Sequence, residues 1–179
     1  MKPIPAVLAE TAFDRIGCEL IAGALRAADG PLVIRAGGSS MVPAIWPGDT
    51  IEIHAPGGAR MAAGQVAVFS RDDRLFAHRI IAIEERAGVA QFITRGDALA
   101  ASDPPVACAE ILGYVGAVIR DGRRIPIACR APGRRARMLA FTIRNSGLMR
   151  RLILRLHARR RGRIGSSVDS RVNKNECPA

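Results

Sequence analysis

The clearest structural signal in the chain is QVAVFSRDDRLFAHRIIAI, residues 65–83. Two runs rich in Val, Ile and Phe, 65–70 and 75–83, flank the pair Asp72-Asp73, and this pattern is typical of a β-hairpin. Asp121-Gly122 predicts a second hairpin turn, and further short apolar runs are predicted as strands at 32–35, 50–54, 89–94, 111–119 and 123–128. Strands at this spacing predict a mainly β fold, a curled antiparallel sheet or partial barrel.

Helical segments are expected on both sides of the β domain. Apolar residues recur at helical spacing over residues 7–27 and again, with interspersed arginines, over 134–161. The expected organisation is an N-terminal helical segment (1–30), a β domain (31–131), a basic amphipathic helical segment (132–163) and a disordered tail (164–179).

The positive charge of the chain is concentrated in one segment. Fourteen arginines and no acidic residue lie between Asp121 and Asp169, which leaves 13 basic and 16 acidic residues in the rest of the chain. A basic and apolar helix over residues 134–163 suits an anionic membrane surface, although the same helix could dock on the β domain with its arginines in water. Nucleic acid is an unlikely partner, since Phe141 is the only aromatic residue in this segment.

The sequence predicts a cytoplasmic location, with peripheral association with a membrane as a further possibility. The chain has no run of 18 apolar residues, and acidic residues interrupt its N-terminal region early, as Glu10 and Asp14 do. The four cysteines fall in no metal-like spacing, which favours free thiols in a reducing compartment. We expect neither a metal nor a cofactor.

Three segments have the character of a catalytic site. The first runs from Gly38 through Ser40 to Pro43 and is followed by Pro47-Gly48-Asp49; the second contains His78; the third contains Gly96-Asp97 and then Asp103. Each is weak evidence alone, because serines and Gly-Asp pairs are common in turns.

The order and spacing of these segments resemble those of type I signal peptidases and the wider superfamily of serine peptidases around them. The resemblance covers roughly residues 33–119. It implies a mostly β fold and an endopeptidase that removes a leader or maturation peptide after small residues. It also implies Ser40 as the nucleophile, with Met41 beside the substrate. A nucleophilic serine needs a hydroxyl on a tight turn, which glycine permits, beside free backbone N–H groups, and the sequence around Ser40 fits this need.

Composition selects the general base. Members of the superfamily use either a Ser-Lys dyad or, in the endoplasmic-reticulum type, a Ser-His-Asp site. The only lysines are Lys2 and Lys174, one at each end of the chain. His78 lies where the resemblance places the base, and an imidazole accepts a proton near neutral pH. His54, interpreted as a surface residue, and His157, in the arginine segment, are the rivals.

The acid that orients the base is expected to be Asp103. The resemblance implies a Gly-Asp pair followed about six residues later by a second Asp, and Asp103 holds that second place. Asp97 is expected to brace the turn and remains the alternative. A carboxylate on the base fixes its tautomer.

Two departures from the resemblance bear on function. Many members carry a hydroxyl residue two positions before the nucleophile; this chain has Gly38 there and a serine one place later, Ser39. The N-terminal membrane anchor of signal peptidases is not seen either. Two other readings stay open: a self-cleaving regulator of the SOS type, and a binding module that keeps the peptidase fold without its chemistry.

Overall fold

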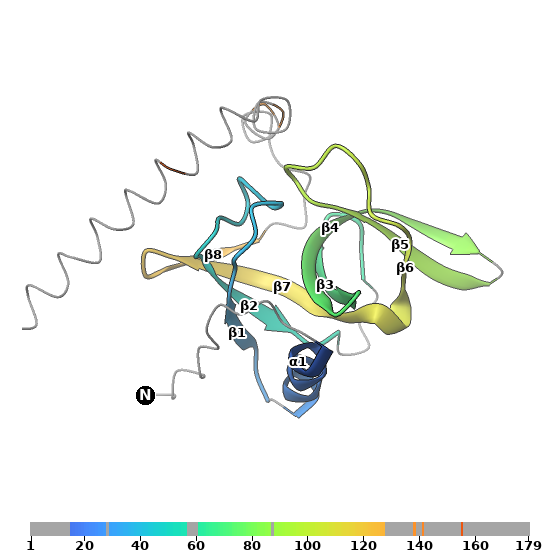
Figure 1. Ribbon diagram of the computed structural model, residues 1–179, viewed down its shortest axis with the longest axis horizontal. Coiled ribbons are helices and arrows are strands. Elements are labelled where there is room, and N and C mark those ends of the chain that lie inside the picture. The colour runs from blue at the N-terminus through green and yellow to red at the C-terminus, as the bar shows by residue number, and fades with distance from the viewer. Residues whose placement is uncertain are drawn as a thin grey trace, which may run out of the picture. The chain divides into compact units, whose positions relative to one another are not determined.

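The fold is mainly β, as the sequence predicts, with one helix at its N-terminal side (Figure 1). The computed structural model describes residues 15–27, 29–56, 61–86, 88–127, 138, 141 and 155. The predictions made for residues 1–14, for most of the basic segment 132–163 and for the tail 164–179 lie outside the described residues.

The elements follow the predicted strands closely. In chain order they are α1 (Arg15–Ala27), β1 (Leu32–Arg35), β2 (Thr50–His54), β3 (Val66–Arg71), β4 (Arg74–Arg86), β5 (Val89–Arg95), β6 (Val106–Ala107), the 3-10 turn η1 (Cys108–Glu110), β7 (Ile111–Arg120) and β8 (Arg123–Pro126). The short β6 and η1 were not predicted.

The strands form one open antiparallel sheet in the order β1-β2-β7-β3-β4-β5-β6. Strand β7 is central: β2 pairs with one of its edges, while β3 and β8 pair with the two halves of the other edge. Register shifts in the β2–β7, β3–β7 and β4–β5 pairs mark bulges, and bulges increase the local bend and twist of a sheet. The sheet is accordingly strongly curled (Figure 1).

Both predicted hairpin turns are confirmed. Asp72 and Asp73 have φ angles of 50° and 55° between β3 and β4, and Asp121 and Gly122 have 50° and 74° between β7 and β8. Two successive residues with positive φ match the twist of the flanking strands, and Asp and Gly adopt this conformation at low cost. The turn at Asp72 fixes the register that pairs His78 with Ala67.

Strand β3 is covered on both faces, which explains its continuous apolar sequence. Val66 and Val68 belong to a core cluster that also contains Ile21 and Leu25 of α1. Ala67 and Phe69, on the opposite face of β3, belong to a second cluster with Ile80 and residues of β5, β6 and β7. Side chains alternate between the faces of a strand, so curling places a core on each side of β3.

The chain divides into two compact units, residues 1–140 and 141–179. All the helices and strands given above belong to the first unit. Of the second, the structure describes only Phe141 and Arg155, both in helical conformation. Among the described residues, no helix combines the length and the apolar character needed to cross a bilayer.

Candidate active site

Ser40 lies in the loop between β1 and β2, and the ends of this loop are tied together. The Ala36 N–H donates to the Asp49 carbonyl at 2.8 Å, and the Gly48 N–H donates to the Ala36 carbonyl at 2.6 Å. Gly48 has a φ of 84°, a conformation that favours glycine. The segment Pro47-Gly48-Asp49 therefore closes the loop that presents the serine.

The Asp49 side chain anchors this loop from inside. It is fully buried, accepts the Trp46 N–H at 2.8 Å and forms an ion pair with Arg120 at 2.6 Å. Arg120 also donates to the Ala44 carbonyl at 3.2 Å. A buried carboxylate is stable only when it is paired and hydrogen-bonded, and here both conditions hold. No local sequence pattern identifies Arg120, 71 residues away, as the partner.

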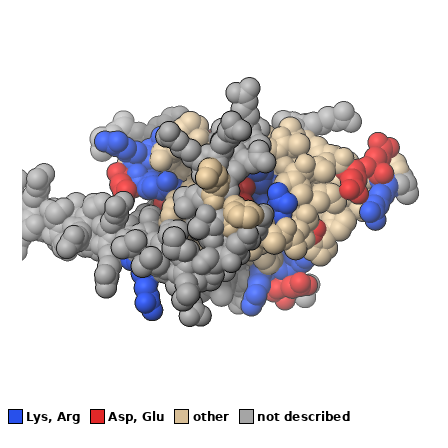
Figure 2. Space-filling model, turned by 90° about the horizontal axis from the view of Figure 1, so that it is seen from above, with Lys and Arg blue, Asp and Glu red and all other residues tan. Residues whose placement is uncertain are grey.

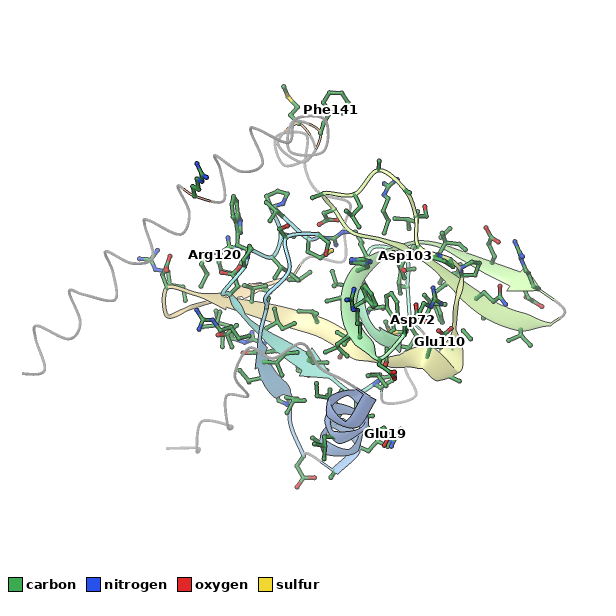
Figure 3. All side chains as sticks on the ribbon, in the orientation of Figure 1. Glu19, Asp72, Asp103, Glu110, Arg120 and Phe141 are labelled. Carbon is green, nitrogen blue, oxygen red and sulfur yellow. The ribbon has the colours of Figure 1, made fainter. Side chains whose placement is uncertain are left out.

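The structure brings Ser40, His78 and Asp103 together in a line. The Ser40 hydroxyl lies 3.0 Å from His78 Nε2, and the Asp103 carboxylate lies 2.7 Å from His78 Nδ1. With the carboxylate accepting the Nδ1 proton, Nε2 is free to accept the proton of the serine hydroxyl. One hydroxyl, one imidazole and one carboxylate thus follow one another through hydrogen bonds, and Asp103 lies beside the curled part of β4 (Figure 3).

The imidazole of His78 is held in an apolar setting. Its side chain is only 4% exposed. The Phe69 ring meets it at an angle of 70°, with centroids 6.1 Å apart, and the Phe76 ring lies 5.7 Å away. Such packing fixes the ring plane and limits competition from water for Nε2 and Nδ1.

Thr94 holds Asp103 in place. Its hydroxyl donates to Asp103 Oδ2 at 2.7 Å, and its carbonyl accepts the Asp103 N–H at 2.8 Å. Thr94 is fully buried on β5. No sequence pattern identifies Thr94 as a site residue, because only the fold brings residues 94 and 103 together.

Asp97, the residue expected to brace the turn, contacts Arg79. It forms a two-pronged ion pair with Arg79, with N–O distances of 2.9 and 2.8 Å, and both side chains are under 10% exposed. Arg79 also donates to the Gly64 carbonyl at 2.7 Å. The pair joins β4, immediately after His78, to the Gly96-Asp97 turn.

The same turn holds the backbone of Ser40. The Ala98 N–H donates to the Ser40 carbonyl at 2.8 Å. A Cβ atom at Gly96 would lie 2.7 Å from that carbonyl oxygen, which is too close for any side chain. Gly96 is therefore required by the close approach of the two loops.

A cleft of about 490 Å³ opens beside Ser40 and His78. Its wall is largely aliphatic and includes Met41, the residue expected beside the substrate. The exposed residues Arg35 and Arg74 also line it, and among the residues that the structure describes no carboxylate does. On the face shown in Figure 2, by contrast, acidic and basic side chains lie next to one another.

The remaining predicted residues surround the nucleophile or lie elsewhere. Gly38 lines the cleft and has open space where a side chain would be. Ser39 accepts the Val42 N–H at its carbonyl, at 3.4 Å. No acceptor in the described part of the chain takes the Ser40 N–H.

His54 is not the surface residue that the sequence suggested. It is half-buried on β2, and its ring stacks on Tyr114 with centroids 5.3 Å apart. His157 lies outside the described residues.

No protein-family model matches the chain, and no curated protein matches its sequence.

Proposed function

We propose that this chain is a serine endopeptidase of the signal-peptidase-like type, which cleaves a leader or maturation peptide after small residues. The observation that supports it best is the continuous chain of hydrogen bonds from Ser40 through His78 to Asp103. A serine, a buried imidazole and a carboxylate in that order have the geometry needed to activate a hydroxyl for attack on a carbonyl.

In the proposed reaction the Ser40 oxygen attacks the scissile carbonyl carbon while its proton passes to His78 Nε2. The tetrahedral intermediate then collapses, the C–N bond breaks, and the leaving amine takes the proton from His78. Water, deprotonated by the same imidazole, hydrolyses the ester on Ser40 and releases the acid product. Asp103 stays ionised and stabilises the imidazolium formed in each half of the cycle.

Backbone groups support the negative oxygen of the intermediate in this proposal. Gly38 has no hydroxyl to donate to this oxygen. The Ser40 N–H, which has no acceptor among the described residues, is therefore the donor that we assign to the negative oxygen. Preorganised N–H donors of this kind account for a large share of catalysis in acyl transfer.

The cleft suits an extended peptide. Among the described strands β1 pairs only with β2, so its other edge has backbone groups for a bound strand, and Ile34 and Arg35 of β1 line the cleft. Its aliphatic wall favours uncharged side chains near the cut. Arg35 and Arg74 add positive charge to the cleft, which disfavours basic side chains in the bound peptide.

The test is incubation of the full chain with a mixed library of synthetic peptides, followed by mass spectrometry of the products. We expect internal cleavage by the wild type, none by Ser40→Ala, and unchanged cleavage by Ser102→Ala, which removes an exposed hydroxyl next to Asp103. Cleavage that persists in Ser40→Ala would refute the assignment of the nucleophile. The absence of any cleavage would favour the binding module instead.

A further inference from the structure

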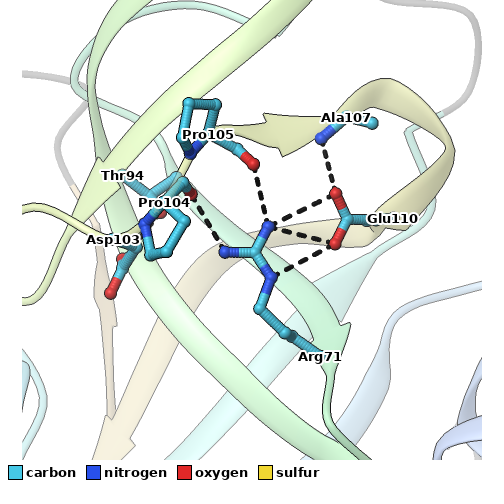
Figure 4. A network of polar contacts seen from close by, with 7 residues as sticks. All are labelled: Arg71, Thr94, Asp103, Pro104, Pro105, Ala107 and Glu110. Carbon is cyan, nitrogen blue, oxygen red and sulfur yellow. Dashed lines mark hydrogen bonds and ion pairs between the residues drawn. The ribbon is translucent and has the colours of Figure 1, made fainter.

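Arg71, at the end of β3, contacts the chain segment that follows the orienting acid. Its guanidinium donates to the Pro104 carbonyl at 3.0 Å and to the Pro105 carbonyl at 2.9 Å. The same group forms an ion pair with Glu110 at 3.1 Å (Figure 4). All these contacts come from one side chain.

Glu110 extends this contact to the next turn of the chain. Both of its carboxylate oxygens accept hydrogen bonds from Arg71, and its Oε2 also accepts the Ala107 N–H at 2.7 Å. The segment from Pro104 to Glu110 is therefore fastened to the end of β3 at both of its ends (Figure 4).

The two prolines explain why an arginine is needed at this place. Proline has no N–H, so neither Pro104 nor Pro105 can be fixed by donating a backbone hydrogen bond. Only their carbonyls can therefore link the backbone of these two exposed residues to the rest of the fold. A guanidinium presents five N–H groups in a rigid fork, so it can hold two carbonyls and a carboxylate together.

The position of Arg71 links the acid to the base. Asp103 immediately precedes Pro104, and His78 lies on β4, which forms a hairpin with β3. The hairpin that carries the base thus also holds the backbone that follows the acid. Arg71 itself is not among the residues that line the cleft.

We infer that Arg71 is a positioning residue, which sets the distance between Asp103 and His78 by holding the carbonyls of Pro104 and Pro105. The inference rests on the proposed function for its meaning in catalysis. The placing of the Asp103 carboxylate on His78 Nδ1 does not depend on peptidase activity, so it is measured separately.

The first measurement is the low-field proton resonance of His78 Nδ1–H, assigned by its loss in His78→Gln. We compare the wild type with Arg71→Met, which keeps most of the side-chain length and removes every hydrogen bond. The control is Arg86→Met, which removes an exposed ion pair with Glu84 at the far end of β4. We expect an upfield shift or loss of the resonance in Arg71→Met only. An unchanged resonance in a folded Arg71→Met would overturn the inference, even if the chain proved to have no peptidase activity.

The second measurement is the rate at which an alkyl fluorophosphonate labels Ser40. We expect Arg71→Met to slow labelling on the order of 10- to 100-fold, because misplaced catalytic groups cost rates of this size. In an Asp103→Asn background the same substitution should have no further effect, since Arg71 acts through Asp103. Equal losses in both backgrounds would show a general structural role and overturn the inference. If Arg71→Met does not fold, Arg71→Lys, which keeps the charge and loses the planar fork of donors, takes its place in both measurements.

Discussion

The three residues of the candidate site are each held by a partner that takes no part in bond making. Thr94 orients Asp103, the rings of Phe69 and Phe76 pack against His78, and Ala98 fixes the Ser40 carbonyl. Preorganisation of this kind lets the reacting groups keep their geometry without further ordering. Substitutions of neighbouring side chains are therefore expected to differ in their effects on cleavage and on stability.

The two aspartates near the base provide the sharpest contrast. Asp103→Asn should fold normally and slow peptide cleavage on the order of 10⁴-fold, because an amide at this position favours the wrong imidazole tautomer. Peptide cleavage and the melting temperature are measured on the same samples. A fully active Asp103→Asn would show that another group orients His78.

Asp97→Asn should act mainly on stability. It leaves the Arg79 guanidinium, only 7% exposed, without its carboxylate. Breaking a buried ion pair on one side costs roughly 3–5 kcal/mol in the free energy of unfolding. Denaturant unfolding measures this loss, and a stable but inactive Asp97→Asn would transfer the orienting role from Asp103 to Asp97.

Thr94→Val tests the support of the acid with little change in side-chain volume. It removes the hydroxyl that donates to Asp103 Oδ2 and leaves the backbone bond between the two residues. A hydrogen bond to a charged group contributes about 1.5–3 kcal/mol, so we expect a 10- to 100-fold slower cleavage. Thr94→Ser, which keeps the hydroxyl, is the matched control and should stay close to the wild type. Equal activity of Thr94→Val and Thr94→Ser would remove Thr94 from the site.

At the scale of elements, the site depends on two loops that approach one another closely. Gly96→Ala should disturb the nucleophile loop, because the added Cβ would lie 2.7 Å from the Ser40 carbonyl oxygen. Gly30→Ala is the control, since nothing lies within 4 Å of a Cβ there. We expect a marked loss of fluorophosphonate labelling in Gly96→Ala and none in Gly30→Ala. Normal labelling of Gly96→Ala would show that the contact between the loops is not needed.

The sequence predicts elements well where local chemistry specifies them. Asp72-Asp73 and Asp121-Gly122 tolerate positive φ and lie between runs of strand-forming residues, so both hairpins are specified locally. Strand β6 has only two residues and exists through its pairing with β5, which no local pattern reveals. The prediction that Ser40, His78 and Asp103 form one site rests on a family resemblance. Thr94, Arg71 and Arg120 were missed because their partners lie 9 to 76 residues away.

At the scale of the whole molecule, the uneven charge predicts where the chain meets other surfaces. Fourteen of the 27 basic residues lie between Asp121 and Asp169, where no acidic residue occurs. Truncation after Pro132 should abolish binding to vesicles that contain anionic lipid, and added salt should weaken binding of the full chain, because exposed charges are screened beyond ~10 Å at 0.1 M. Vesicles of neutral lipid are the control. Equal vesicle binding by the full and truncated chains would exclude the basic segment as the membrane contact.

The most direct test of the central claim is covalent trapping of the nucleophile. An alkyl fluorophosphonate forms an O–P bond with an activated serine and releases fluoride, while the serine proton passes to the base. Mass spectrometry of the digested protein then identifies the labelled residue. We expect a label on Ser40 in the wild type and in Ser39→Ala, and labelling slowed by several orders of magnitude in His78→Ala. Unlabelled Ser40 in the folded wild type, or equally fast labelling in His78→Ala, would contradict the claim that Ser40 is a nucleophile activated by His78.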